Sequence, residues 1–274
     1  MTMPWRPHLL ALCLSLAPLS QAAAASSEWY ESEGGRIRLV ALPAAEDGSI
    51  RAMLDIRLQP GWKTYWRDPG ESGIPPVIDV KGTPGVTLEG TGFPMPRQFD
   101  DGATRYIAYD HSVALPLKLR QSPGARADTI KASVFLGICD EICVPVQAEL
   151  SVDVGAESFA NPLEIAALDD AEARLPERAS EDFRATSASW SGDGKTLSVM
   201  FRAPDDDGAP PEVLVSGPEG FQFGVARPTG QGDGSYSYEV PLVRKPKAAD
   251  GKTAQLLLTV RSGARTMETP LVLD

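Results

Sequence analysis

Short runs in which apolar and polar residues alternate dominate the pattern along this chain. Such alternation has the period of a β-strand with one buried face, and clusters of Gly, Pro and Asp separate the runs as turns do. The runs cover residues 36–42, 52–58, 112–119, 129–135, 144–152, 196–201, 212–216, 235–242 and 253–260. We therefore expect an all-β protein.

One segment has the features of a helix. It runs from Asn161 to Leu175, and Asn161 is suited to cap its N-terminus. Pro162 would occupy the first helical position and Pro176 would end the helix. This pattern predicts a short linker helix between two β domains.

Paired prolines indicate an internal repeat. Pro116 and Pro145 in the first half are spaced like Pro241 and Pro270 in the second. We expect two related β-sandwiches, over residues 26–156 and 181–274, with residues 157–180 as the linker. The same offset places Ala264 and Glu268 opposite Cys139 and Cys143, so the second sandwich is expected to lack cysteines.

The first 25 residues have the layout of a secretory signal peptide. Arg6 precedes an apolar run, residues 9–19, and four alanines follow at residues 22–25. No later segment approaches the roughly 18 apolar residues of a membrane span, so we expect a soluble exported protein. The mature chain would carry 25 basic and 37 acidic residues, a net charge of −12. That charge argues against nucleic acid and anionic membranes as partners.

Cys139 and Cys143 are the only cysteines beyond the signal peptide. In an oxidising compartment, two nearby cysteines favour a disulfide. They lie between two expected strands, at the shoulders of a tight hairpin. A disulfide that closes a ring of about five residues stabilises the folded state by only about 2 kcal/mol through loop entropy. Stabilisation of the fold is therefore a weak reason for the cysteine pair. Its short connection favours an exchangeable bond, although Asp140 and Glu141 disfavour a thiolate.

Other readings of the cysteine pair stay open. Two thiolates with His111, the one histidine beyond residue 25, could hold Cu(I) in a copper-binding or copper-tolerance protein. The pair could instead be a structural disulfide in a non-catalytic interaction module. Trp62, Tyr65 and Trp66 could form a wall near the cysteines or simply fill the sandwich. Tyr106 and Tyr109 are interpreted as packing residues.

Three motifs resemble a known family. They are Gly61-Trp-Lys-Thr-Tyr-Trp-Arg-Asp-Pro-Gly-Glu-Ser-Gly-Ile-Pro-Pro76, Phe93-Pro-Met-Pro-Arg97 and Cys139-Asp-Glu-Ile-Cys-Val-Pro145. Together they resemble the N-terminal periplasmic domain of DsbD and, more closely, of the ScsB-type transmembrane disulfide reductases. The resemblance covers residues 28–155 and implies an immunoglobulin-like fold. It also implies a periplasmic thiol-disulfide oxidoreductase, either a protein-disulfide reductase or an electron shuttle, that needs no organic cofactor.

The resemblance also implies roles and partners. Cys143 would form the mixed disulfide and Cys139 would resolve it, while Phe99 would cap the pair and Asp100 or Asp101 would accept a proton. Electrons would pass from a membrane-embedded thiol:disulfide transporter to an oxidised periplasmic thioredoxin-fold protein. The full-length reductases also carry a membrane domain and a C-terminal thioredoxin-like domain. This sequence shows neither, so we expect a separately encoded membrane donor.

Overall fold

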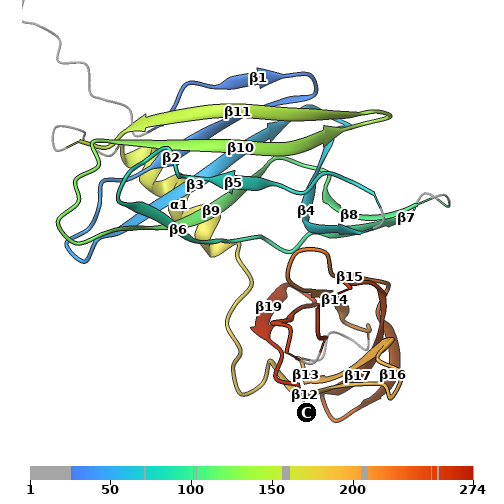
Figure 1. Cartoon of the computed structure of the whole chain (residues 1–274). Coiled ribbons are helices and arrows are strands. Elements are labelled where there is room, and N and C mark those ends of the chain that lie inside the picture. Colours follow the sequence, from blue (N-terminus) through green and yellow to red (C-terminus); the bar gives the residue numbers. More distant parts are fainter. Residues whose placement is uncertain are drawn as a thin grey trace, which may run out of the picture.

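The computed structural model describes residues 26–70, 72–100, 102, 104–155, 161–204, 209–247, 249–251 and 253–273. The expected signal peptide, residues 1–25, lies outside these ranges. Nearly all regular structure in the described residues is β, as the alternation predicts, and it forms two sandwiches (Figure 1). No helix in the described part of the chain is long and apolar enough to cross a membrane.

The first sandwich consists of two antiparallel sheets. One has the strand order β1-β2-β3-β9-β6, and the other has the order β11-β10-β4-β8-β7 with β5 paired to β10. The strands are β1 (Tyr30–Ser32), β2 (Gly35–Ala41), β3 (Ser49–Leu58), β4 (Lys63–Gly70), β5 (Val77–Asp79), β6 (Val86–Thr91), β7 (Arg97–Asp100), β8 (Arg105–Tyr109), β9 (Val113–Gln121), β10 (Thr129–Cys139) and β11 (Cys143–Asp153).

The second sandwich repeats this arrangement without the cysteines. Its sheets have the orders β12-β13-β17-β15, with β16 also on β17, and β14-β18-β19. The strands are β12 (Arg184–Trp190), β13 (Thr196–Arg202), β14 (Glu212–Ser216), β15 (Gln222–Phe223), β16 (Arg227–Gly232), β17 (Ser235–Arg244), β18 (Leu257–Ser262) and β19 (Arg265–Pro270). In chain order, β2-β3-β9 and β4-β10-β11 correspond to β12-β13-β17 and β14-β18-β19. The shared topology agrees with two related sandwiches.

The proline offset misaligns the two hairpin ends. The β10–β11 hairpin ends at the pair Cys139 and Cys143, whereas the β18–β19 hairpin ends at the pair Ser262 and Arg265. Ala264 therefore lies in the second turn, not opposite Cys139. The hairpin ends correspond at offsets of 123 and 122, not at the 125 of the prolines, so Glu268 also lies three residues beyond the hairpin end, where it pairs with Thr259. The two arms differ by one because the second turn has two residues between its strands and the first has three.

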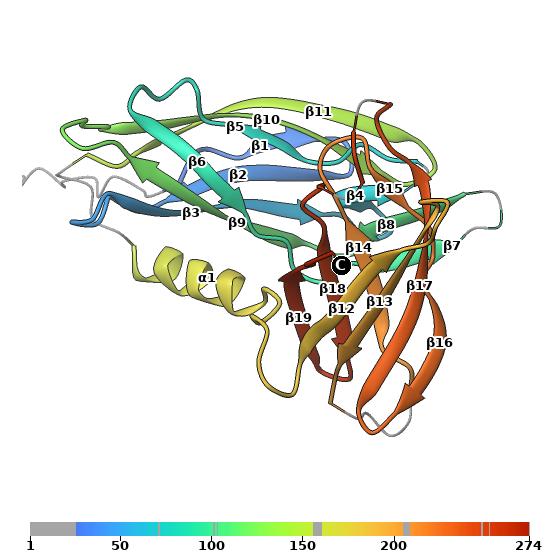
Figure 2. The ribbon, with the colours of Figure 1, turned by 60° about the horizontal axis from the view of Figure 1, so that its bottom comes forward.

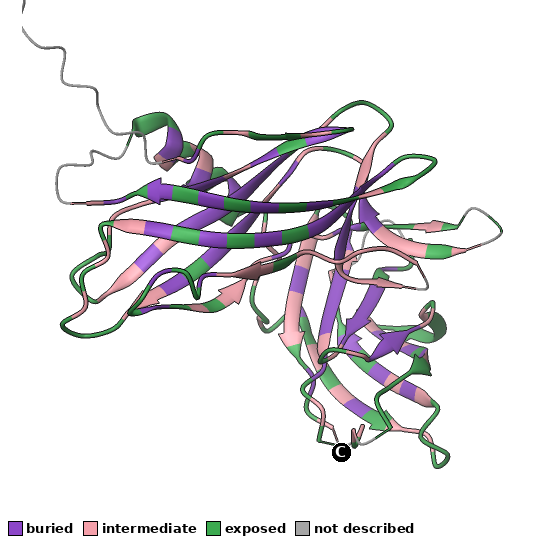
Figure 3. Cartoon of the chain, turned by 45° about the horizontal axis from the view of Figure 1, so that its top comes forward, coloured by how far each residue is buried: buried purple, intermediate pink, exposed green. Residues whose placement is uncertain are grey.

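Each sandwich has its own core. Side chains that alternate along the strands point inward, which gives the buried and exposed bands of Figure 3. Trp66 and Tyr109 are among the largest fully buried side chains of the first core, and Phe183 and Phe201 are among those of the second. Leu214 of the second sandwich packs into the first core, so the cores are joined by an apolar contact.

The predicted helix is present as α1 (Pro162–Ala173). The Asn161 side chain accepts a hydrogen bond from the backbone N–H of Leu163 and caps the helix, with Pro162 at its start as expected. Leu168 and Ala171 pack on Val40 and Met53, which lie on the outer face of the β2–β3 sheet. The linker helix is thus bound to the first sandwich (Figure 2).

Candidate functional site

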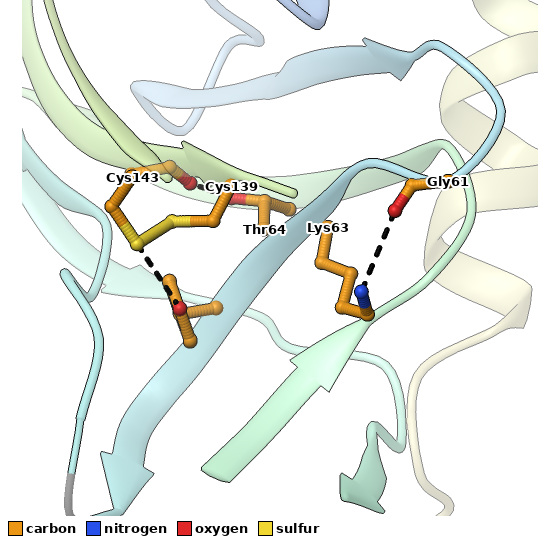
Figure 4. The surroundings of a disulfide bond; sticks show 7 residues. Gly61, Lys63, Thr64, Cys139 and Cys143 are labelled. Carbon is orange, nitrogen blue, oxygen red and sulfur yellow. Dashed lines mark hydrogen bonds between the residues drawn. A yellow bond between two sulfur atoms is a disulfide. The ribbon is translucent and has the colours of Figure 1, made fainter. Parts of the chain in front are cut away.

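The two cysteines form a disulfide at the end of the β10–β11 hairpin. Cys139 is the last residue of β10 and Cys143 is the first of β11, and they are the terminal pair of the ladder. Their Cα atoms are 4.1 Å apart. The turn closes with a 3.1 Å hydrogen bond from the Asp140 N–H to the Ile142 carbonyl. The position at the hairpin shoulders, expected from sequence, is confirmed (Figure 4).

The two sulfur-bearing residues differ in exposure. Cys139 is only 4% exposed and packs with Tyr65 and Ala108. Cys143 is exposed, and its neighbour Ile142 presents an apolar side chain that is 65% exposed. Cys143 is therefore the solvent-accessible cysteine of the pair, and Cys139 is enclosed.

Tyr65 on β4 contacts the exposed cysteine directly. Its hydroxyl lies 3.3 Å from Cys143 Sγ, and because a disulfide sulfur carries no hydrogen, the hydroxyl is the donor. Burial and the neighbouring Tyr106 raise the pKa of Tyr65 above its ordinary value. The phenol thus stays protonated at neutral pH and can donate to the sulfur.

Close backbone approaches fix Tyr65 and the hairpin. A Cβ on Gly73 would lie 2.5 Å from the Tyr65 ring, so only glycine lets this segment pass beneath the ring. A Cβ on Gly137 would lie 2.9 Å from the Ile74 side chain, so glycine is needed at this close approach as well. The Thr64 hydroxyl donates a 2.9 Å hydrogen bond to the Gly137 carbonyl and ties β4 to β10 (Figure 4). Residues of the first motif therefore hold Tyr65 in its position beside the disulfide.

Phe99 lies at the edge of the same cluster. It packs on the group formed by Tyr65, Ala108 and Cys139. Its ring stacks on Tyr106 with centroids 5.1 Å apart, and Tyr106 meets Tyr65 edge-on at 6.2 Å. Tyr106, which the sequence analysis interprets as a packing residue, does pack, and it connects Phe99 to Tyr65. Its place beside Phe99 follows from the β7–β8 hairpin, which pairs the two residues.

Of the two acidic candidates, Asp100 lies among the described residues. Asp100 accepts a 2.8 Å hydrogen bond from the Arg105 guanidinium and another from the Gly102 N–H. These contacts, with the Arg105 bond the largest, lower the pKa of Asp100 below its ordinary value. Asp100 is therefore a weak proton acceptor. Asp101 lies outside the described residues.

The other sequence candidates are dispersed. Of the three aromatics in the first motif, Tyr65 alone has a contact with a sulfur atom among the described residues; Trp66 is buried in the core and Trp62 packs on its edge. His111 is exposed and its Nδ1 lies 2.9 Å from Asp110. The described ranges contain no group of three or more His, Cys, Asp and Glu residues arranged to hold a metal. His111 and the cysteines thus form no such group.

Comparison with known proteins links this geometry to a family. Residues 38–154 match the family described as thiol:disulfide interchange protein DsbD, N-terminal. The N-terminal periplasmic domain of ScsB from Proteus mirabilis superimposes with a TM-score of 0.72 at 22% identity, covering 91% of this chain and 99% of that domain. That coverage includes both sandwiches.

Two further comparisons carry no argument. A marsupial T cell receptor gives a TM-score of 0.20 at 9% identity, over 88% of this chain and 97% of that one, which is too low for an argument about fold. No curated protein matches the chain in sequence. The family match spans the sandwich that carries the disulfide and supports thiol-disulfide exchange as its general chemistry. The chain thus resembles the N-terminal periplasmic domains of the DsbD and ScsB type, in sequence over the first sandwich and in fold over both.

Proposed function

We propose that this chain is a periplasmic thiol-disulfide exchange protein that relays electrons through Cys139 and Cys143. The observation that carries the proposal is the asymmetric disulfide, with Cys143 exposed and Cys139 behind it. A membrane-embedded thiol:disulfide transporter supplies the electrons. An oxidised periplasmic thioredoxin-fold protein receives them.

The loading step is a pair of exchanges. A donor thiolate attacks Cys143 Sγ, the Cys139–Cys143 bond breaks, and Cys139 leaves as a thiolate. The donor's second thiolate then attacks its own sulfur in the mixed disulfide and releases Cys143. Two electrons and two protons have then passed to this chain, and the donor is left with a disulfide.

The delivery step reverses these roles. The Cys143 thiolate attacks one sulfur of the client disulfide, and the client's other sulfur leaves as a thiolate. Cys139 then attacks Cys143 Sγ, re-forms the internal disulfide and releases the reduced client. The Tyr65 hydroxyl donates a hydrogen bond to Cys143 Sγ and stabilises the negative charge that develops on this sulfur. Phe99 and Tyr106 pack on the cluster that contains Cys139 and shield this inner cysteine between encounters.

A purely structural role for the disulfide has less support. The corresponding β18–β19 hairpin forms with Ser262 and Arg265 at its end, and without sulfur. A hairpin of this topology therefore closes without a covalent link. Thiol-disulfide exchange accounts for the presence of two cysteines in this hairpin, whereas stabilisation of the hairpin does not.

The direct test is to trap the partner. In Cys139→Ala, Cys143 can attack a client but no second thiol can resolve the complex, so a mixed disulfide should accumulate in the periplasm. Cys143→Ala is the matched control and should trap nothing, because its remaining thiol is buried. Recovery of a thioredoxin-fold protein on Cys143 supports the proposal. Equal trapping by both variants, or none by either with folded protein, contradicts it.

A further inference from the structure

The two cysteines lie on the outer face of the sheet that contains β10 and β11. Successive pairs in the β10–β11 ladder alternate between the core and this face (Figure 3), so the pair Gly137 and Pro145 shares the face of the cysteine pair. The next pair on this face contains Phe135, whose partner on the other side is Val77 of β5. Gly137 has no side chain, and Ile74 lies over it. Strand geometry therefore aligns these side chains along one face, starting at the disulfide.

Exposed apolar side chains gather at the disulfide end of this face. Ile142 in the turn is 65% exposed, Val77 is 57% exposed and Phe135 is 41% exposed, and Pro145 is exposed as well. Of the exposed large apolar side chains in the described part of the first sandwich, only Tyr30 lies elsewhere. Contiguous apolar surface of this kind marks a site of interaction.

The same face becomes polar beyond Phe135. Ser133, two residues before Phe135, donates a 2.6 Å hydrogen bond to Glu149, and Lys131 and Ser151 follow, both exposed. Phe135 lies opposite the fourth residue along β11 from the disulfide, which is about 14 Å at about 3.4 Å for each residue. The apolar strip therefore consists of Ile74, Val77, Phe135, Ile142 and Pro145.

A protein bonded to Cys143 has this strip within its reach. A mixed disulfide places the partner's sulfur about 2 Å from Cys143 Sγ. Even a small transient interface buries about 600 Å² on each partner, which corresponds to a disc about 14 Å in radius. A disc of that size around Cys143 extends from the turn to Phe135. The strip is therefore continuous with the surface at which the proposed exchange takes place.

The turn beside Cys143 is acidic. Asp140 and Glu141 are both exposed, whereas the side chain of Lys63 points toward the Gly61 carbonyl (Figure 4). Negative charge beside a thiol disfavours its thiolate. In the delivery step Cys143 is the nucleophile, so this step gains most from a partner whose positive charge offsets the turn.

We propose that the apolar strip and the acidic turn together form the docking face for the electron-accepting client, whose reactive cysteine lies in an apolar surface edged by Lys or Arg. The inference rests on the proposed function and adds the surface chemistry of the client. Apolar contact holds the client over the strip, and its basic residues lie against Asp140 and Glu141. Docking then favours the Cys143 thiolate, so exchange is fast with basic clients and slow with acidic ones.

The test measures how fast the reduced full chain reacts with disulfide-linked dimers of three peptides. The first peptide is Leu-Lys-Leu-Ser-Cys-Ser-Leu-Lys-Leu, in which the leucines share the face of the cysteine when the peptide is extended. The second has Glu in place of Lys, and the third has Ser in place of Leu. Dividing each rate by that of mercaptoethanol with the same dimer removes the intrinsic reactivity of the probe.

The reaction is a complete exchange. The Cys143 thiolate attacks one sulfur of the dimer, and one peptide leaves as a thiolate. Cys139 then attacks Cys143 Sγ, re-forms the internal disulfide and releases the second peptide. Two electrons pass from the protein to the two peptides, and each peptide takes up one proton.

The native chain should prefer the basic, apolar dimer. Lysines at about 7 Å from Asp140 and Glu141 should favour it over the Glu dimer by about threefold to tenfold. Burial of about 40 Å² of apolar surface on the strip should favour it over the Ser dimer by about fivefold.

Matched variants assign each preference to its part of the face. The double variant Asp140→Asn, Glu141→Gln should lose the preference for Lys over Glu. Phe135→Ser should reduce the preference for Leu over Ser by about twofold to threefold, and Val77→Ser tests the same strip if Phe135→Ser does not fold. Met200→Ser is the control and should keep both preferences, because Met200 is 46% exposed on β13 of the second sandwich.

The outcomes separate docking from exchange itself. Both preferences, each weakened in its own variant and kept in Met200→Ser, support the proposal. Equal normalised rates with all three dimers, or equal changes in Phe135→Ser and Met200→Ser, overturn it, as does a preference for Lys that survives the double variant. Hydroxyethyl disulfide is uncharged and too small to need a docking face. If the reduced chain fails to reduce this probe as well, exchange through Cys139 and Cys143 is itself contradicted.

Discussion

The Tyr65 hydroxyl gives a quantitative prediction about the reactivity of Cys143. The hydroxyl lies 3.3 Å from the sulfur, and a hydrogen bond to a charged group contributes about 1.5–3 kcal/mol. At about 1.4 kcal/mol for each pKa unit, Tyr65→Phe should raise the pKa of the Cys143 thiol by about one to two units. The phenyl ring still fills the space, so the change removes the donor and little else.

The effect on rate is smaller than the effect on ionisation. Below its pKa, the thiolate fraction falls about 10-fold to 100-fold, but each thiolate becomes more nucleophilic with a Brønsted coefficient of about 0.4–0.5. The net loss of exchange rate at neutral pH is therefore about threefold to tenfold. At a pH above the Cys143 pKa of both the variant and its parent, the variant reacts faster. Both thiols are then fully ionised, and the variant thiolate is the stronger nucleophile.

The assay is the pH dependence of Cys143 alkylation by iodoacetamide, in a Cys139→Ala background that leaves one thiol. Tyr238→Phe is the control, since its hydroxyl donates a 2.7 Å hydrogen bond to the Pro211 carbonyl, within the second sandwich. It should leave the alkylation profile unchanged. Superimposable profiles for Tyr65→Phe and its parent, without a crossing, would refute the assigned role of the hydroxyl.

Three further changes test other parts of the structure. Phe99→Ala removes the stack on Tyr106, worth about 0.5–1.5 kcal/mol, and loosens the packing around the buried Cys139, so the Cys139 thiol of the reduced protein should be alkylated about twofold to tenfold faster in a timed alkylation assay. Burial raises the pKa of Asp68 to about 6. Between about pH 4 and pH 6 the folded state therefore keeps a proton on Asp68 that the unfolded state has released. The stability that Asp68 contributes when protonated is lost as the pH rises through this range. Asp68→Asn should therefore raise the free energy of unfolding by about 1–2 kcal/mol at pH 8 and leave it nearly unchanged near pH 4, as measured by urea denaturation; an equal shift at both values would contradict burial of the charge. Asn161→Ala removes the bond to the Leu163 N–H and should cost about 1 kcal/mol of stability without altering reduction of the disulfide.

Much of the fold follows from local sequence. Each of the nine alternating runs falls on a strand, although β18 begins at Leu257 and not at residue 253. Strands without one buried and one exposed face show no alternation in the sequence, so the pattern does not predict them. Every residue of β16 is exposed, and the first half of β4 has three consecutive buried residues, so neither shows alternation. The helix was found because its cap and its prolines are local signals.

The site was predictable in part. The cysteines lie in one hairpin, so local spacing was enough to place them together. Tyr106 stacks on Phe99 across a single hairpin, so this contact is local in the sequence. Arg67 of β4 instead pairs with Glu268 of β19, 201 residues away. A contact of this second kind depends on how sheets pack, and no local pattern predicts it.

In the proposed exchange, the unequal exposure of the two cysteines imposes regioselectivity on every encounter. A visiting thiolate has one accessible electrophilic sulfur, so only one covalent adduct forms and the leaving group is always the inner thiol. That inner thiol remains sequestered within the sheet, where a second visitor cannot intercept it. The chain can therefore engage a single protein at a time, and each adduct is released either by the inner thiol or by the visitor's own second thiol.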